Sequence, residues 1–221
     1  MTTRFIAKME DVLSVYERPY DPLRPVVCMD EKAKELQGHR EGHEPLSAVP
    51  GEVGKEIERQ DYMYKRGGLA NLIMVCEPLR GWRRVAVTAD RTARTFAYQL
   101  QKVVDEDFPD AEVVVIVTDN LNTHGPWSLY EAFPPQEARR IAERLEWHYT
   151  PEHGSWLNMA EIELSVLGRQ CLARRIGDDQ TLIEEVGEWE RARNQAATTI
   201  NWHFTTSDAR IKLRRLYPVV S

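Results

Sequence analysis

The sequence has few cysteines and no long hydrophobic run, and these absences exclude several classes of protein. Cys28, Cys76 and Cys171 lie far apart in the chain, which argues against a disulfide framework and for a reducing compartment. No stretch approaches the roughly eighteen uninterrupted apolar residues of a membrane span, and the charged N-terminus is unlike a secretory signal. We therefore predict a cytoplasmic protein without a membrane partner.

Signatures of several common ligand sites are also absent. The chain has no phosphate-binding glycine loop, no dinucleotide fingerprint and no Gly-x-Ser-x-Gly elbow, so ATP, NAD and serine-hydrolase functions lack support. A zinc site built from His124, His153 and a cysteine is also disfavoured, because these residues form no close ligand pair. The net charge of −6 disfavours a stand-alone DNA-binding module. It is compatible with a carboxylate-rich nuclease, because bound metal ions would supply positive charge.

The order of apolar patterns predicts an α/β protein. Helical spacing occurs near the N-terminus up to Arg18-Pro19 and in three later segments, over 94–104, 134–145 and 158–167. A last long helix begins at a cap on Asp178 or Asp179. Short apolar runs predict strands ending at Asp30 and over 71–76, 82–88, 112–118 and 147–150, and the polar stretch 37–61 predicts a loop. A mixed five-stranded sheet flanked by helices fits this order.

Three acidic residues occupy positions that favour metal chemistry. Asp30 and Asp119 each end a predicted buried strand, and Glu161 lies one turn into a later helix. Strand ends are where ligands gather in α/β sheets. Converging carboxylates repel one another unless cations offset their charge, and hard oxygen ligands suit Mg²⁺ or Mn²⁺. Two such ions promote in-line phosphoryl displacement.

Each of these acids also has an ordinary structural explanation. Asp30 is in a position typical of a turn or a helix cap, and Asp119 suits a turn with Asn120 and Asn122. The Asn158-x-x-Glu161 spacing is a variant of the capping box. Taken singly, each residue favours the structural explanation. Their joint placement at the ends of separate elements favours a metal site.

Polar residues around the three acids form a predicted supporting set. His124 and His153 follow two of the predicted strands, where they are candidates for positioning a phosphate or a water molecule. The whole set contains acids, amides, a hydroxyl and two histidines: Glu31, Asn120, Asn122, His124, His153, Ser155, Asn158 and Glu163.

Basic residues gather in two places along the chain. Most charge clusters are solvated faces, but clusters that flank the carboxylates would contact DNA phosphates. We predict DNA contacts for Arg80, Arg83, Arg84, Arg91 and Arg94, and for Arg210, Lys212, Arg214 and Arg215.

Five motifs together resemble the DDE superfamily endonuclease domain of mariner-related bacterial insertion-sequence transposases. Three of them contain the acids: VCMDEK at 27–32, VTDNLNTH at 117–124 and HGSWLNMAEIE at 153–163. YKRGGLAN at 64–71 and WHFTTSDARIKL at 202–213 are also similar to that family. The resemblance covers nearly the whole chain, and the second and third motifs together are the most specific.

The resemblance implies a ribonuclease H-like fold and a transposase function. It implies that Asp30, Asp119 and Glu161 bind two Mg²⁺ ions, for which Mn²⁺ substitutes, with Glu163 as the alternative third ligand. The family cuts double-stranded DNA by attack of water and joins a 3′-hydroxyl to target DNA, and its members act as homodimers. The implied division is an N-terminal helix and linker over 1–24, a DDE catalytic domain over 25–200 and a C-terminal tail over 201–221.

One departure from the family keeps other functions open. About 25 residues precede the first strand, too few for the helix-turn-helix modules with which relatives begin, so we expect poor sequence-specific DNA binding. One alternative is a catalytically incompetent transposase remnant that only binds DNA or a partner. Another is a different ribonuclease H-like nuclease, such as a resolvase or an RNA–DNA hybrid hydrolase.

Overall fold

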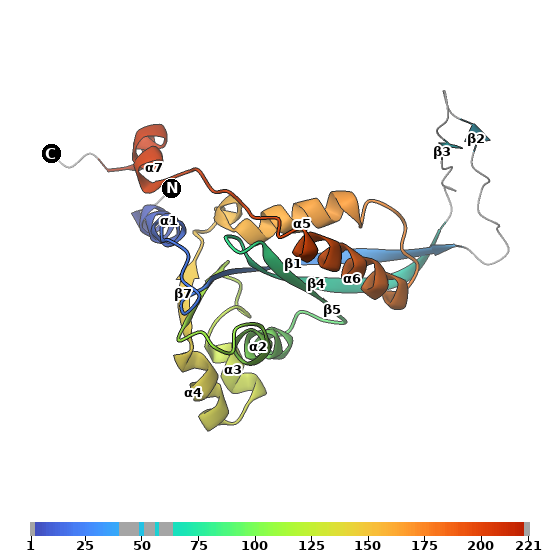
Figure 1. The fold of residues 1–221 in the computed structure, drawn as a ribbon, viewed down its shortest axis with the longest axis horizontal. Coiled ribbons are helices and arrows are strands. Elements are labelled where there is room, and N and C mark those ends of the chain that lie inside the picture. The colour runs from blue at the N-terminus through green and yellow to red at the C-terminus, as the bar shows by residue number, and fades with distance from the viewer. Residues whose placement is uncertain (1–2, 40–48, 51–55, 58–63, 219–221) are drawn as a thin grey trace.

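The computed structural model describes residues 3–39, 49–50, 56–57 and 64–218, and a mixed five-stranded sheet lies at its centre (Figure 1). The strands are β1 (Val26–His39), β2 (Val49–Pro50), β3 (Glu56–Ile57), β4 (Tyr64–Glu77), β5 (Trp82–Thr88), β6 (Val114–Thr118) and β7 (Leu145–Tyr149). The large sheet has the order β5-β4-β1-β6-β7, while β2 pairs with β3. β1 is antiparallel to β4 and parallel to β6, which confirms the predicted mixed sheet.

Helices cover both faces of this sheet (Figure 1). They are α1 (Thr3–Tyr16), α2 (Ala93–Lys102), α3 (Trp127–Ala132), α4 (Pro135–Glu143), α5 (Met159–Gln170), α6 (Asp179–Gln195) and α7 (Thr206–Lys212). In Figure 1, α5 and α6 lie over one face and α2, α3 and α4 lie over the other. The sheet is therefore the middle layer of three. None of the helices in the described ranges is long and apolar enough to cross a membrane.

β6 shows how the sequence specifies this sandwich. All five of its residues are buried. Val115 and Val117 belong to the hydrophobic cluster under α5 and α6, whereas Val114 and Ile116 belong to the cluster under α2 and α4. A strand covered on both faces reads as an uninterrupted β-branched run, which is why this strand is the clearest in the sequence.

The two ends of the chain pack into the same core as the sheet. Met9 and Leu13 of α1 are fully buried in the cluster under α5, and Ala209 of α7 is buried there as well. Trp202 packs against Tyr16 with ring centroids 5.2 Å apart. α1 and the described C-terminal segment that contains Trp202 and Ala209 thus share one hydrophobic core with the sheet.

Some element boundaries differ from the sequence prediction. β1 continues to His39, so the start of the loop predicted over 37–61 is wrong, and β4 begins at Tyr64 rather than near residue 71. The cause is their mutual pairing, which runs from Cys28 opposite Cys76 to His39 opposite Tyr64 and overrides a polar composition. Residues 40–48, 51–55 and 58–63 of the predicted loop lie outside the described residues.

Glu146 links the segment after α1 to β7. Its carboxylate accepts hydrogen bonds from Arg18 (2.8 Å) and Arg24, and it lies 2.9 Å from Nε2 of His148. Burial alone would raise the pKa of Glu146, but the hydrogen bonds with His148 and Arg18 outweigh it and lower the pKa to about 2. The ionised form therefore stabilises the folded protein.

We expect Glu146→Gln to lower the free energy of unfolding by about 1–2 kcal/mol at pH 7. This is less than the pKa shift alone would imply, because the side chain is 28% exposed and solvent screens its interactions. The folded pKa lies below the ordinary 4.5, so the contribution is present above about pH 4.5 and is lost as the pH falls toward 2. Urea denaturation at pH 7 and pH 3 tests this. Glu143→Gln, at an exposed pair with Arg139, is the control. An equal loss at both pH values would contradict the prediction.

Candidate active site

The register of the parallel strands brings Asp30 and Asp119 together. Cys28 of β1 lies opposite Val117 of β6. Asp30 is two residues beyond Cys28, and Asp119 is two residues beyond Val117. The two aspartates therefore lie side by side, with their side chains on the same face. Asp30 lies inside β1, which continues to His39, so the prediction that this aspartate ends its strand is wrong. The strand register, rather than the meeting of two strand ends, brings the two aspartates together.

Asn158 brings the third acid to the same place. Its side chain caps α5 by accepting a hydrogen bond from the amide of Ala160 (3.1 Å), and its Nδ2 donates to the carbonyl of Met29 (2.8 Å). The same Nδ2 lies 3.4 Å from Oδ2 of Asp30. Asn158 thus ties the start of α5 to the first half of β1, and Glu161 lies in the first turn of that helix.

The capping-box explanation of Glu161 does not hold in the structure. Asn158 caps the helix through Ala160, and its own backbone N–H donates to the carbonyl of Ser155 (2.7 Å) rather than to Glu161. The side chain of Glu161 is exposed and faces an open cavity. Its position is therefore not explained by helix capping.

Asp30, Asp119 and Glu161 line one open cavity of about 570 Å³. Its walls come from the first half of β1, the segment after β6, the turn before α5 and one face of α5. The lining residues are Asp30, Glu31, Lys32, Asp119, Ser155, Glu161, Leu164, Ser165, Gly168 and Arg169. The structure therefore brings the three predicted acids to one surface.

The carboxyl groups in this cavity have different electrostatic surroundings. Burial raises the pKa of Asp30 to about 6, and the negative charges of Asp119 and Glu161 add to the rise. Burial also acts to raise the pKa of Asp119, but a hydrogen bond from His124 outweighs it and lowers that pKa. Asp30 therefore carries repulsion that a cation would relieve.

His124 supports the cavity from behind. Its ring is 1% exposed and stacks on Phe96, with centroids 4.3 Å apart. Nδ1 lies 2.5 Å from Oδ1 of Asp119, and Nε2 lies 3.7 Å from Oε2 of Glu31. Burial alone would lower the pKa of His124, but these two carboxylates raise it to about 9. The cationic ring thus holds two acids in place without lining the cavity.

The donor set suits a hard divalent cation, although it is not a closed cage. Carboxylate oxygens are the preferred ligands of Mg²⁺ and Mn²⁺, and Asp30 is a buried carboxyl with unrelieved repulsion. In the described ranges, no three His, Cys, Asp or Glu side chains are close enough to form a ready-made metal site. The chemistry of the donors fits, and binding would require the side chains to close around the ion.

The remaining predicted supporting residues are divided between the cavity and its surroundings. Ser155 lines the cavity. Asn120 donates to the carbonyl of Thr150, and the carbonyl of Asn122 accepts from the indole of Trp127 (2.7 Å), so both stabilise the loop after β6. His153 is exposed at a positive φ of 60° and does not line the cavity.

Glu163 and Arg83 are buried, whereas the sequence prediction requires a cavity ligand and an exposed DNA contact at these positions. Both are 1% exposed, and Nε of Arg83 lies 3.4 Å from Oε2 of Glu163. Arg193 of α6 donates to both oxygens of Glu163, at 2.7 and 3.1 Å. Glu163 as alternative third ligand and Arg83 as a DNA contact are therefore both wrong. They form a buried ion cluster between β5, α5 and α6.

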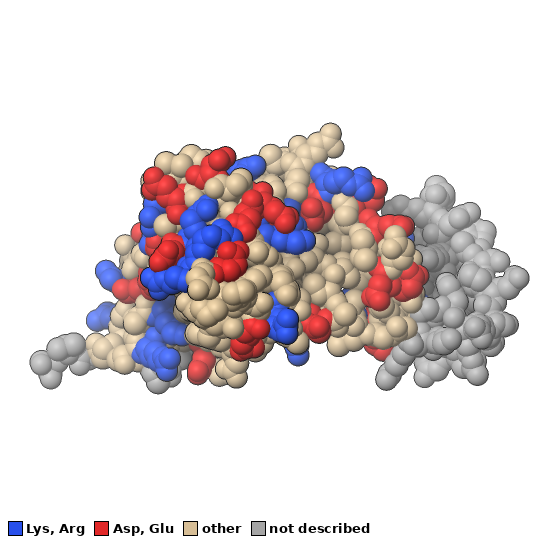
Figure 2. Space-filling model, turned by 90° about the horizontal axis from the view of Figure 1, so that it is seen from below, with Lys and Arg blue, Asp and Glu red and all other residues tan. Residues whose placement is uncertain are grey.

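Several other predicted DNA contacts are engaged in ion pairs. Arg84 binds Asp107 at 2.7 Å, Arg210 binds Glu10 at 2.7 Å and Lys212 lies 3.2 Å from Asp208. Arg91 approaches the cavity, with Nη1 3.3 Å from Glu31. The other predicted contacts are exposed: Arg80, Arg94, Arg214 and Arg215. On the face shown in Figure 2, basic side chains are intermixed with acidic ones rather than forming a continuous basic surface.

Besides the apolar Leu164, four cavity residues were missed by the sequence prediction: Lys32, Ser165, Gly168 and Arg169. A signal for them existed. Lys32 follows Asp30 by two residues in a strand, and the other three follow Glu161 by four, seven and eight residues in a helix. These spacings are the same-face periods of the two elements.

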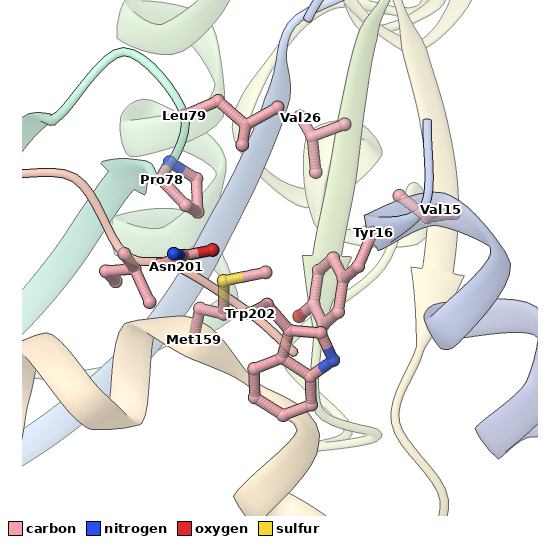
Figure 3. Close-up of a pocket in the computed structure, with 9 residues that line it drawn as sticks. Val15, Tyr16, Val26, Pro78, Leu79, Met159, Asn201 and Trp202 are labelled. Atoms are coloured by element: carbon pink, nitrogen blue, oxygen red, sulfur yellow. The ribbon is translucent and has the colours of Figure 1, made fainter. Parts of the chain in front are cut away.

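A second cavity lies away from the carboxylates. It has a volume of about 60 Å³, and its walls come from the end of α1, the start of β1, the turn after β4 and the segment before α7. Figure 3 shows Tyr16 and Trp202 beside Met159 at this cavity. None of the predicted catalytic or DNA-binding residues lines it.

Comparisons with known proteins agree with this architecture. A family model for the DDE superfamily endonuclease matches residues 25–183. Similar solved structures include a pre-cleavage Mos1 transpososome (12% identity, TM-score 0.59), the Mos1 strand transfer complex (19%, 0.53) and the mariner Mos1 paired end complex with Mg (16%, 0.50). The matches cover 100, 88 and 90% of this chain but only 65, 55 and 60% of the solved chains.

At these identities the likeness shows the fold, and it confirms the predicted ribonuclease H-like architecture. No curated protein matches the sequence.

Proposed function

Because the chain belongs to the DDE superfamily endonuclease family, we propose that it is the catalytic domain of a transposase that cuts and joins DNA. The observation that carries this proposal is the single cavity lined by Asp30, Asp119 and Glu161 from three separate elements. The solved chains with this fold belong to a transpososome, a strand transfer complex and a paired end complex with Mg. The substrate class we propose is double-stranded DNA.

The proposed cofactor is Mg²⁺, with Mn²⁺ as a substitute. Asp30, Asp119 and Glu161 would hold the ions, which when bound would supply charge stabilisation and an activated oxygen for phosphoryl transfer. Asn158 keeps Glu161 beside Asp30, and His124 fixes the orientation of Asp119. The protein's own contribution is therefore to place three carboxylates and to leave an open face for the DNA backbone.

A metal titration followed by a cleavage assay tests the proposal. We expect calorimetry to show millimolar or tighter Mn²⁺ binding by the wild type and sharply weaker binding by Asp119→Ala. Nicking of a supercoiled plasmid in Mg²⁺ or Mn²⁺ should fall by about 100-fold or more in the same variant. Glu143→Ala is the matched control, since this glutamate is exposed on α4 and does not line the cavity. The titration is repeated with a short duplex present.

The outcomes separate the competing functions. Equal metal binding and nicking by the wild type and Asp119→Ala would reject the carboxylate site. Metal binding without nicking or joining would identify a catalytically incompetent remnant. Cleavage of an RNA–DNA hybrid without joining of DNA would identify a different ribonuclease H-like nuclease. The homodimer implied by the family resemblance stays a prediction.

A further inference from the structure

The carboxylate cavity contains two basic side chains. Lys32 follows Asp30 on β1, and Arg169 follows Glu161 on α5, and both side chains line the cavity. Both residues are exposed. They are thus accessible to a ligand that enters from the open side.

Gly168 lets the ammonium group of Lys32 approach the helix turn that carries Arg169. A Cβ atom added at Gly168 would stand 3.2 Å from Nζ of Lys32, so the ammonium lies against α5 at the residue that precedes Arg169. Nη1 of Arg169 donates to Oγ of Ser165 (2.7 Å), which also lines the cavity. Two positively charged side chains and one hydroxyl group therefore lie on the same wall of the cavity.

The two cations line the same cavity as four carboxylates but are not ion-paired with any of them. In the part of the chain that the structure describes, neither Lys32 nor Arg169 forms an ion pair, whereas Arg84, Arg91 and Arg210 each pair with a carboxylate. Both side chains are therefore available to an anionic group that enters the cavity.

The basic patch lies at a defined distance from the acids. Glu161 and Gly168 are seven residues apart on α5, which corresponds to about 10 Å along the helix axis. A DNA strand carries one phosphate per roughly 3.4 Å of duplex axis, so a strand that runs along α5 has further phosphates within this distance. A strand whose reacting phosphate lies at the carboxylates would place a later phosphate at the cations.

We propose that Lys32 and Arg169 bind a backbone phosphate of the DNA strand that reacts at Asp30, Asp119 and Glu161. The inference rests on the proposed function, because it takes the ligand to be a phosphodiester. Lys and Arg donors with a serine hydroxyl are common contacts of DNA phosphates. They position the strand without reading its sequence.

DNA affinity over a series of NaCl concentrations tests the inference. We expect Lys32→Ala and Arg169→Ala each to lower the slope of log K against log salt by about 1, and the double variant by about 2. Arg169→Lys should keep the slope, and Arg139→Ala, at an exposed ion pair on α4, is the matched control. Binding is followed by anisotropy of a labelled duplex. Calorimetry with Mn²⁺ should give unchanged metal affinity in all variants.

Each outcome bears on the inference separately from the proposed function. Unchanged salt slopes in the Ala variants would overturn the inference even if the wild type nicks DNA. A loss of Mn²⁺ affinity in Lys32→Ala would also overturn it, because the lysine would then act on the carboxylates. Absence of nicking by the wild type would count against the proposed function, while reduced salt slopes would still support a phosphate contact at these two residues.

Discussion

Glu163→Gln is expected to lower the free energy of unfolding by about 3–5 kcal/mol, whereas Glu161→Gln is expected to change it by less than about 0.5 kcal/mol. Glu163 is 1% exposed and accepts two hydrogen bonds from Arg193. Its neutral replacement would leave the 1% exposed guanidinium of Arg83 without a counter-charge. Glu161 is exposed, so its replacement removes no such partner.

Urea denaturation of the two variants measures this difference, and the nicking assay on the same samples gives the complementary result. We expect Glu161→Gln to lose nicking at full stability, and Glu163→Gln to keep nicking at temperatures where it stays folded. Equal stability of both variants would contradict the buried ion cluster. If folded Glu163→Gln lost nicking while Glu161→Gln kept it, the third metal ligand would be Glu163 rather than Glu161.

A double replacement distinguishes ion pairing from packing. Arg83→Met combined with Glu163→Leu removes both buried charges, and Arg193 remains 17% exposed and able to reach solvent. Buried ion pairs are often replaced by apolar residues at little cost, so the double variant should recover most of the stability that Glu163→Gln loses. A double variant as unstable as the single one would mean that shape, rather than charge, limits this site.

The fold was predictable where local pattern and burial agree. β6 is buried on both faces, and its β-branched run shows this directly. β1 was predicted only up to Asp30, because the residues beyond it are polar and are held in the strand by pairing with β4. α3 (Trp127–Ala132) was not predicted, since a six-residue helix contains too few turns to show a period.

The candidate site was predictable where an acid directly follows a buried apolar run, although Asp30 lies inside β1 rather than at its end. Asp30 and Asp119 follow apolar runs, and the strand register then places them together. Arg83 and Glu163 are 80 positions apart, and their ion pair depends on how α5 and α6 pack over the sheet, which no local pattern encodes. Arg83 was therefore assigned to a surface cluster because other arginines are near it in the sequence, although it is a buried residue.

Asp30→Asn is expected to stabilise the metal-free protein at pH 7.5, by about 2 kcal/mol. A pKa near 6 instead of the ordinary 3.8 means that the ionised carboxylate costs the folded state about 3 kcal/mol. Part of the gain is offset because the side-chain amide would face Nδ2 of Asn158, a donor 3.4 Å from Oδ2 in the wild type. When folding raises the pKa of an acid, the ionised acid destabilises the folded state in full at pH values above the folded-state pKa. This destabilisation disappears at pH values below the pKa of the unfolded state.

Divalent metal should reduce the difference in stability between the wild type and Asp30→Asn. With about 10 mM Mg²⁺ and a millimolar dissociation constant, metal binding adds about 1.4 kcal/mol to the free energy of unfolding of the wild type and little to that of Asp30→Asn.

Asp119→Asn is the contrasting variant. The hydrogen bond between Asp119 and His124 lowers the pKa of Asp119, so loss of this carboxylate should destabilise the metal-free protein. Thermal melts in EDTA and in Mg²⁺ measure both effects. If Asp30→Asn and Asp119→Asn shift stability in the same direction in EDTA, Asp30 does not carry the repulsion that a metal ion would relieve.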